Sequence, residues 1–417
     1  MGFENNRGIA LRTKIIAIAV VLIIIVAGVS YLATRPAELQ LPGGTEMVYP
    51  DHTKVDLATH TPFIGGVFLG IDNPWDKANL AAFKWYCGDV LGWKYEVVWP
   101  DADVAKQNDG AEMLIKKGVD ALYACPLDSV ANAKIGEMAR EAGIPVVEFG
   151  IDMESTWPLA FFQRDDREAG LHCGNYIVNA LKEKYGEVRG KVLHIHGYRG
   201  SDSDFLRSAG FIDAVSPYEK ISVIEVGNSW VETAEFPKIK AAMMANPDLD
   251  AVFEEMGGFH SCVVTAAGDL GWSDQKIKDL ICTCDDHFPV NAQGFKEGTQ
   301  DYAELMPTAG YMVAPALETL KEFWQHGPEA LPKIGETFTV KKYVPELKLD
   351  ATVDSWKPLQ WFEDPVYGVS PTEIRPAPCG GPATPWVVIK DRIVTEKNYN
   401  EDFIYWNWPI WGFKTMK

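Results

Sequence analysis

The chain lacks an excess of positive charge. Lys and Arg number 39 against 58 Asp and Glu, so the formal net charge at pH 7 is −19. Nucleic-acid binding depends on Lys and Arg gathered at phosphate groups, so we expect no nucleic-acid partner. The sequence also lacks a Gly-x-Ser-x-Gly and a His-Glu-x-x-His segment, which mark a serine hydrolase and a zinc protease. These absences favour a protein that is not an enzyme.

Cysteine is sparse and does not follow a metal-binding pattern. There are seven Cys, and in an exported chain an odd number leaves at least one thiol unpaired. Cys282 and Cys284 share one face of an expected strand, but no second close pair of Cys or His completes a zinc site. His194 and His196 likewise share a strand face without an evident third ligand. We therefore expect neither a metal nor a cofactor.

A long apolar run lies near the N-terminus. Residues 15–33 carry no charge and follow Arg7, Arg12 and Lys14. A run of about 19 residues is near the minimum that spans a bilayer, and the basic residues before it predict a cytoplasmic N-terminus. A signal anchor is favoured, and a signal peptide cleaved near Gly28-Val29-Ser30 is the alternative. Both interpretations place the rest of the chain outside the cytoplasm, at the cell surface or in the periplasm.

From residue 61 onward, short apolar strands alternate with helices of about 12 residues. The alternation runs from FIGGVFLGI (63–71) to IPVVEFG (144–150), then starts again at KVLHIHG (191–197) and ends at KDLICTCDDH (278–287). This pattern predicts an α/β fold of two Rossmann-like lobes, each with a parallel sheet covered on both faces. Binding sites in such sheets lie beyond the carboxyl ends of the strands.

The residues expected at those strand ends are carboxylates and amides mixed with flat aromatic rings. Carboxylates and amides bond to neighbouring hydroxyl groups, and rings pack on the C–H faces of a sugar. Helix caps and turns use Asp and Asn as well, so each residue also has a purely structural interpretation. The candidate ligand-binding residues at strand ends are Asn73, Trp75, Asp76, Phe149, Asp152, Asp204, Phe205, Trp230, Glu255 and Asp285.

Over about residues 61–354 the chain resembles type I periplasmic binding proteins of the ribose/galactose-binding family. The resemblance rests on the order and spacing of several segments, among them FLGIDNPWDKANLAAF, IKKGVDALYACPLDS, EAGIPVVEFGID and CDDHFPVNAQGFKEG. It implies a Venus-flytrap fold in which the chain crosses between lobes near Asp165, Glu304 and Tyr343. It also implies an ABC-type permease as partner.

The resemblance further implies roles for individual residues. In the first lobe, Asn73, Trp75 and Asp76 would line the pocket. In the second lobe, Trp230 would stack on the ligand, Asp285 would accept hydrogen bonds from its hydroxyl groups, and Phe205 would lie beside them. The remaining implied site residue, at the hinge, is Glu304.

This sequence departs from the ribose-binding pattern at several pocket positions. Gly150-Ile151 replaces an Asp-Arg pair, Phe205 replaces a contacting Arg, and Met256 replaces a contacting Asn, while Arg207 matches an Arg that we interpret as structural. The resulting pocket is more acidic and more aromatic than that of a ribose binder. The favoured ligand is sugar-like, a class that includes polyols and amino sugars. A cationic ligand is the alternative.

The sequence thus predicts a binding module made of several parts. Residues 355–417 are rich in Pro and Trp and form either an extended tail on one lobe or a docking surface. The alternatives to solute binding for transport are a ligand-sensing receptor, an exported hydrolase and a structural spacer. The expected division is 1–14 cytoplasmic, 15–33 signal anchor or signal peptide, 34–60 linker, 61–164 with 305–342 as the N-terminal lobe, 165–304 with 343–354 as the C-terminal lobe, and 355–417 as the extension.

Overall fold

The computed structural model describes residues 48–305, 309–338, 372–389 and 392–399, all within the compact unit Met47–Lys417. The expected apolar helix at 15–33, the crossing near Tyr343 and the segment 343–354 lie outside the described residues. In the part that is described, no helix is both long and apolar enough to cross a membrane.

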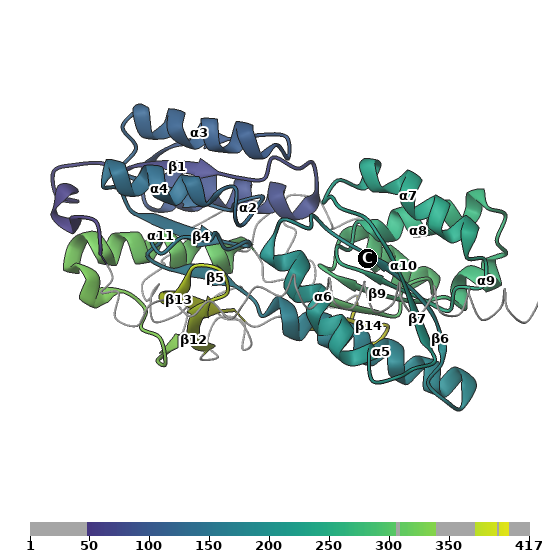
Figure 1. Ribbon diagram of the computed structural model, residues 1–417. Helices are drawn as coiled ribbons and strands as arrows, with labels where there is room; N and C mark the ends of the chain where they lie inside the picture. The colour runs from purple at the N-terminus through teal and green to yellow at the C-terminus, as the bar shows by residue number, and fades with distance from the viewer. Residues whose placement is uncertain (1–47, 306–308, 339–371, 390–391, 400–417) are drawn as a thin grey trace, which may run out of the picture. The chain divides into compact units, whose positions relative to one another are not determined.

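Two parallel-rich sheets organise the described chain, which confirms the predicted α/β class. The first sheet has the order β11-β12-β13-β5-β4-β3-β1-β2 (Figure 1). Its strands pair in parallel except where β12 meets β11 and β13. The strands are β1 (Phe63–Val67), β2 (Lys94–Val98), β3 (Ala121–Ala124), β4 (Val146–Phe149), β5 (Phe161–Gln163), β11 (Thr337–Phe338), β12 (Thr372–Ala377) and β13 (Gly381–Val388).

Helices cover both faces of this first sheet, as parallel strands require. One apolar core lies between the sheet and α3 with α4, and another between the sheet and α2 with α11 (Figure 1). The helical segments are η1 (His52–Lys54), α2 (Pro74–Lys84), η2 (Trp85–Val90), α3 (Val104–Lys116), α4 (Ala133–Ala142), α11 (Ala309–His326) and η3 (Pro328–Ala330).

The second sheet repeats the plan with the order β14-β10-β9-β8-β6-β7. All its pairs are parallel except β10 with β14. Its strands are β6 (Gly190–Ile195), β7 (Ile221–Val226), β8 (Ala251–Glu254), β9 (Ile281–Asp285), β10 (Tyr302–Leu305) and β14 (Arg392–Thr395). The accompanying helices are α5 (Asp166–Tyr185), α6 (Asp202–Val215), α7 (Glu232–Ala245), α8 (Phe259–Asp269), α9 (Asp274–Lys278) and α10 (Pro289–Glu297).

Between described strands the chain changes sheet three times, and two of these passages include residues 306–308 and 390–391, which lie outside the described residues. It leaves the first sheet after β5 and enters α5 at Asp165, whose side chain caps that helix by accepting from the Glu168 backbone N–H. It returns between β10 and α11, and it crosses again between β13 and β14. The C-terminal strands β12, β13 and β14 therefore add to both sheets, and β13 pairs in parallel with β5 through Trp386 and Phe161.

Candidate functional site

One pocket lies where the strand ends of both sheets converge. Its free space is about 350 Å³, part of it open to solvent. The lining comes from both lobes and is Leu69, Asn73, Trp75, Gly150, Ile151, Ser203, Arg207, Trp230, Met256, Asp286 and Phe288.

Two tryptophans, one from each lobe, form the aromatic walls. Trp75 stacks on Phe149 with ring centroids 5.9 Å apart. A Cβ at Gly150, where φ is +74°, would lie 2.5 Å from the Trp75 ring, and a Cβ at Gly197 would lie 1.9 Å from the Trp230 ring. Both tryptophans therefore depend on a glycine for their position. Each indole nitrogen is buried and has no hydrogen-bond partner in the described part of the chain, so each is free to donate to a ligand.

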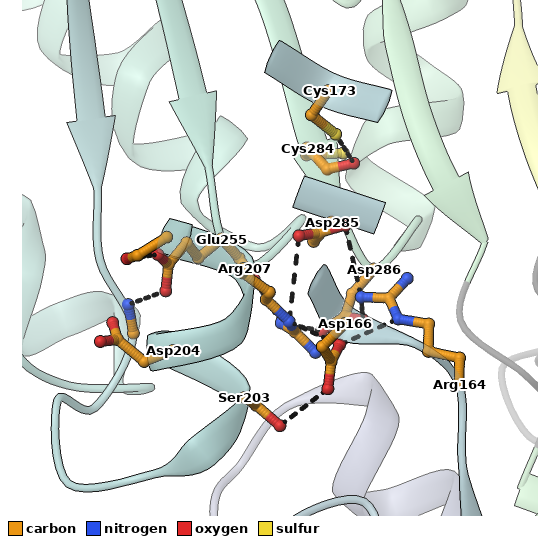
Figure 2. A network of polar contacts seen from close by, with 12 residues as sticks. Arg164, Asp166, Cys173, Ser203, Asp204, Arg207, Glu255, Cys284, Asp285 and Asp286 are labelled. Carbon is orange, nitrogen blue, oxygen red and sulfur yellow. Dashed lines mark hydrogen bonds and ion pairs between the residues drawn. The ribbon is translucent and has the colours of Figure 1, made fainter. Parts of the chain in front are cut away.

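Arg207 forms the charged floor of the pocket. Its Nε donates to Asp166 at 2.9 Å and its Nη1 to Asp286 at 3.2 Å, while Nη1 also donates to the backbone carbonyl of Glu255 (Figure 2). Its guanidinium lies 5.4 Å from the Trp230 ring centre. The side chain that we interpreted as structural from the sequence thus both ties the second lobe together and faces the pocket.

A second buried arginine joins the same network at the first crossing between lobes. Arg164 donates to Asp166 at 3.0 Å and to Asp286 at 3.3 Å, and its Nη2 lies 3.3 Å from Asp285 (Figure 2). Burial opposes ionisation of Asp166, but Arg207 and Arg164 hold its pKa below the usual value. Asp285 is less well compensated, because burial raises its pKa to about 7 despite the two arginines.

Of the predicted site residues, the pocket lining includes Asn73, Trp75 and Trp230. Asn73 also caps α2, because its side chain accepts from the Asp76 backbone N–H at 2.9 Å. Asp76 lies just behind it and accepts from the Ile71 backbone N–H. Asn73 therefore both caps α2 and lines the pocket.

Several predicted residues lie behind the lining or away from it. Phe149 supports Trp75 from behind. Asp285 faces Arg164, and its neighbour Asp286 lines the pocket with an unusual φ of +65°. Phe205 is 42% exposed on α6 and is absent from the lining.

Asp152 lies at a buried contact between the lobes. Its backbone N–H donates to Asp202 at 3.2 Å, and its carboxylate accepts from the backbone N–H groups of Cys379 and Gly380. Burial raises the pKa of Asp152 to about 6, and burial together with Asp152 raises that of Asp202. The turn between β12 and β13 is thereby joined to the contact between the lobes.

The remaining predicted residues lie within the second lobe. Glu304 is buried and accepts from the Tyr302 hydroxyl, with His172 Nδ1 at 3.1 Å. Asp204 and Glu255 are buried beside two histidines, behind the pocket wall.

Sequence reasoning placed Gly150, Ile151 and Met256 at changed pocket positions and interpreted Arg207 as structural. The lining residues that it did not name are Leu69, Ser203, Asp286 and Phe288. Asp286 and Phe288 directly follow β9, so their position at a strand end was a usable signal. Ser203 lies in the first turn of α6 and donates to Asp166 at 3.0 Å, which no local pattern indicates.

The comparison with known sequences gives one family and several relatives. A family model described as "Periplasmic binding protein domain" matches residues 64–325. The ribose import binding protein of Escherichia coli (strain K12) is 27% identical over 209 residues, which cover 49% of this chain and 67% of that protein. The ribose import binding protein of Bacillus subtilis (strain 168) is 27% identical over 168 residues, which cover 39% of this chain and 51% of that protein.

A third relative is named for a different ligand. The xylitol-binding protein of Mycolicibacterium smegmatis is 23% identical over 226 residues, which cover 53% of this chain and 63% of that protein. The aligned part of the chain therefore spans between about half and two thirds of these curated relatives.

Solved structures extend the likeness over most of the chain. A galactofuranose binding protein superposes with a TM-score of 0.65 at 14% identity and covers 84% of this chain and 99% of its own. A carbohydrate transporter solute binding protein from Agrobacterium radiobacter, in complex with D-arabinose, gives a TM-score of 0.61 at 16% identity and covers 83% and 98%. At these identities the likeness shows a shared fold.

Proposed function

The chain belongs to the family of periplasmic binding protein domains, and we propose that it is an extracytoplasmic solute-binding protein for a sugar-like small molecule. The observation that carries the proposal is the pocket lined from both lobes, with Trp75 on one side and Trp230 on the other. The names of the relatives and of a similar structure give ribose, xylitol and D-arabinose as ligands, which supports a sugar-like ligand for this chain.

The polar groups of the pocket suit a neutral ligand with several hydroxyl groups. Arg207 can donate, Asp286 and the Ser203 hydroxyl oxygen can accept, and Asn73 can do both. Asp286, the acid in the pocket lining, is already paired with Arg207 at 3.2 Å, which disfavours a cationic ligand at this carboxylate. Flat rings cover the C–H faces of a sugar and exclude water from its hydroxyl bonds.

Capture would bury the ligand between the two lobes. Because the lining belongs to both sheets, a ligand that contacts both walls favours the closed arrangement over an open one. We propose that an ABC-type permease recognises this closed form. Ligand-stimulated ATP hydrolysis in vesicles that carry the permease would support transport, and its absence would favour a sensing role.

Thermal unfolding against a compound panel tests the ligand class. The panel comprises D-ribose, D-arabinose, xylitol, myo-inositol, an amino sugar and a diamine. A ligand at about 1,000 times its dissociation constant stabilises the folded state by roughly 4 kcal/mol, which raises the Tm by several degrees. We expect a shift with one of the hydroxylated compounds.

Matched variants separate pocket binding from unspecific stabilisation. Trp230→Ala should abolish the shift, whereas Trp272→Ala, which removes a tryptophan outside the pocket lining, should keep it. A shift only with the diamine would contradict the sugar-like class. A shift that survives in Trp230→Ala would contradict the assignment of the pocket.

A further inference from the structure

A cluster of buried histidines and carboxylates lies behind the second-lobe wall of the pocket. His194 and His196 come from the end of β6, and their rings lie 3.9 Å apart between centroids. Glu255 follows β8 and Asp204 lies in the first turn of α6. All four residues are buried, with at most 5% of their surface exposed. The fold thus supplies the carboxylates that were not evident beside the two histidines in the sequence.

The distances within this cluster match those between ligands of a small metal ion. His196 Nδ1 lies 3.2 Å from Asp204 Oδ1 and 3.6 Å from Glu255 Oε1. Zinc bonds of about 2.1 Å in a tetrahedron place neighbouring ligand atoms about 3.4 Å apart. Ser208 Oγ lies 3.2 Å from the same His196 nitrogen and donates to Glu255 Oε1 at 2.6 Å. Three ligand atoms therefore converge from three separate elements.

Histidines, rather than lysines or arginines, accompany the two carboxylates of the cluster. Within the described residues, Asp204 pairs with His196, and Glu255 lies beside His194 and His196, while no Lys or Arg side chain forms an ion pair with either carboxylate. Two carboxylates are costly to ionise together when both are buried, because each loses its hydration. A divalent cation among these oxygens would compensate both charges.

The other nitrogen of the His196 ring lies outside this set of ligand atoms. His196 Nε2 and His194 Nδ1 are buried without a hydrogen-bond partner among the described residues. The proposed ligand atom of His196 is Nδ1, which lies near Asp204 and Glu255, whereas Nε2 is 3.8 Å from Glu225.

We propose that His196, Asp204 and Glu255 bind a divalent transition-metal ion, with zinc as the best fit to one imidazole and two carboxylates. His194 Nε2, 2.8 Å from Glu255 Oε1, and the Gly197 N–H, which donates to Glu255 Oε2, orient that carboxylate from the outer shell. Glu225 Oε1, 3.8 Å from His196 Nε2, takes the corresponding position behind the imidazole.

Among the described residues, a neighbouring group of His194, His196 and Glu225 shares its histidines with the proposed site, and two separate groups of potential metal ligands lack this combination of features. In the group of Glu254, His260 and Cys282, both nitrogens of His260 have partners, namely Glu254 and Thr299. In the group of Asp152, Asp202 and Cys379, one Asp152 oxygen already accepts two backbone N–H groups. The cluster at His196 is therefore the stronger site.

The proposed ion would stiffen the wall that carries the ligand-facing side chains. Glu255 accepts from Arg207 through its backbone carbonyl, and Gly197 packs under the Trp230 ring. An ion that joins β6, β8 and α6 would hold Arg207 and Trp230 in place before a ligand arrives. This ion binds without the solute, so the test is independent of the proposed transport function.

Isothermal titration of the chelator-stripped full chain with zinc, manganese and calcium chloride tests the proposal. We expect one equivalent of zinc to bind and to raise the Tm, with calcium binding far more weakly. His196→Gln should lower the zinc affinity at least 100-fold. Cys282→Ser and Cys379→Ser, which change the two other groups, and His60→Gln, which removes an exposed histidine, should leave it unchanged.

Cobalt substitution provides a second measurement that does not depend on affinity. Cobalt bound at the proposed site should show the visible bands of a four-coordinate ion without the thiolate-to-cobalt band of a cysteine ligand. Asp204→Asn serves as the second variant if His196→Gln does not fold by circular dichroism. Absence of zinc binding, or zinc binding that survives in the folded His196→Gln or Asp204→Asn chain, would overturn the proposal.

Discussion

The two lobes contribute walls of different chemistry to the pocket. Behind Trp75 the first lobe places a stack of aromatic rings, in which Phe149 lies 4.1 Å from Tyr123 between centroids and Tyr123 lies 5.2 Å from Phe83. Behind Trp230 the second lobe places arginines, carboxylates and histidines, most of them buried. An apolar stack is stable by itself, whereas a buried polar network depends on every member having its partner.

The first-lobe wall mainly sets the shape of the pocket, and the second-lobe wall supplies its hydrogen-bonding groups. The first-lobe wall needs no ions to hold Trp75, because ring contacts and apolar burial fix it. The second-lobe wall fixes donors and acceptors, and it holds them with Arg207 and Arg164 between three aspartates. Changes in the second lobe should therefore cost more, and the buried carboxylates Asp76 and Asp166 should respond to pH with opposite signs.

The largest effect is expected from Arg207→Met. The substitution leaves the Glu255 carbonyl without this donor and removes one of the two arginines that pair with Asp286, and breaking a buried ion pair typically costs about 3–5 kcal/mol. The free energy of unfolding in urea measures this loss. Arg167→Met, which breaks the exposed ion pair with Asp213, is the control and should cost less than about 1 kcal/mol. Equal losses in both variants would remove the distinction between the network and a surface pair.

Substitutions of the two pocket tryptophans should affect ligand affinity and folding stability differently. Trp230→Ala should weaken binding of the best panel compound about 30-fold, since a buried aromatic contact is often worth about 2 kcal/mol. Trp75→Ala should weaken binding too, and it should also cost about 3–5 kcal/mol of stability because it ends the stack on Phe149. Titration calorimetry and urea unfolding measure the two quantities. Identical profiles for both variants would contradict the proposed difference between the walls.

The pH dependence of stability should show Asp76 and Asp166 acting in opposite directions. Burial raises the pKa of Asp76 to about 7 in the first lobe, where Tyr123 and Cys125 face it and keep their protons. The folded state then holds a proton that the unfolded chain releases, so stability falls as the pH rises from about 4 to about 7, by at most about 1.4 kcal/mol per pH unit.

Asp166 acts with the opposite sign in the second lobe. Its pKa is lowered by Arg207 and Arg164, against the effect of burial, so its contribution is present above about pH 4 and is lost as the pH falls further. Asp76→Asn should flatten the decline between about pH 4 and 7, and Asp166→Asn should remove the acid limb. Urea unfolding across this range measures both, and an unchanged slope in Asp76→Asn would contradict the assignment.

The smallest effect is expected from Phe205→Ser. The side chain is 42% exposed and does not line the pocket, so stability should change by about 0.5 kcal/mol or less. Ligand affinity should stay the same within error in calorimetry. A clear loss of affinity would mean that the ligand reaches beyond the pocket to α6.

The first-lobe wall was the easier one to find from the sequence. Asn73 and Trp75 directly follow an apolar strand, and a residue at a strand end is visible in the local pattern. The second wall was harder. Arg207 and Ser203 lie inside α6, and Asp286 differs from the predicted Asp285 by one position at the end of β9. Which of two adjacent side chains turns toward a pocket depends on a backbone angle, here the positive φ of Asp286.

The sequence by itself determined the two parallel-rich sheets, because the alternation of strands and helices reflects burial on a local scale. Only the tertiary structure decided that β13 pairs with β5 and that β14 pairs with β10. It also decided that Asp204 and Glu255 meet His196. These contacts join residues far apart in the chain, and the free energy that selects them comes from packing and charge compensation, which leave no periodic trace in the sequence.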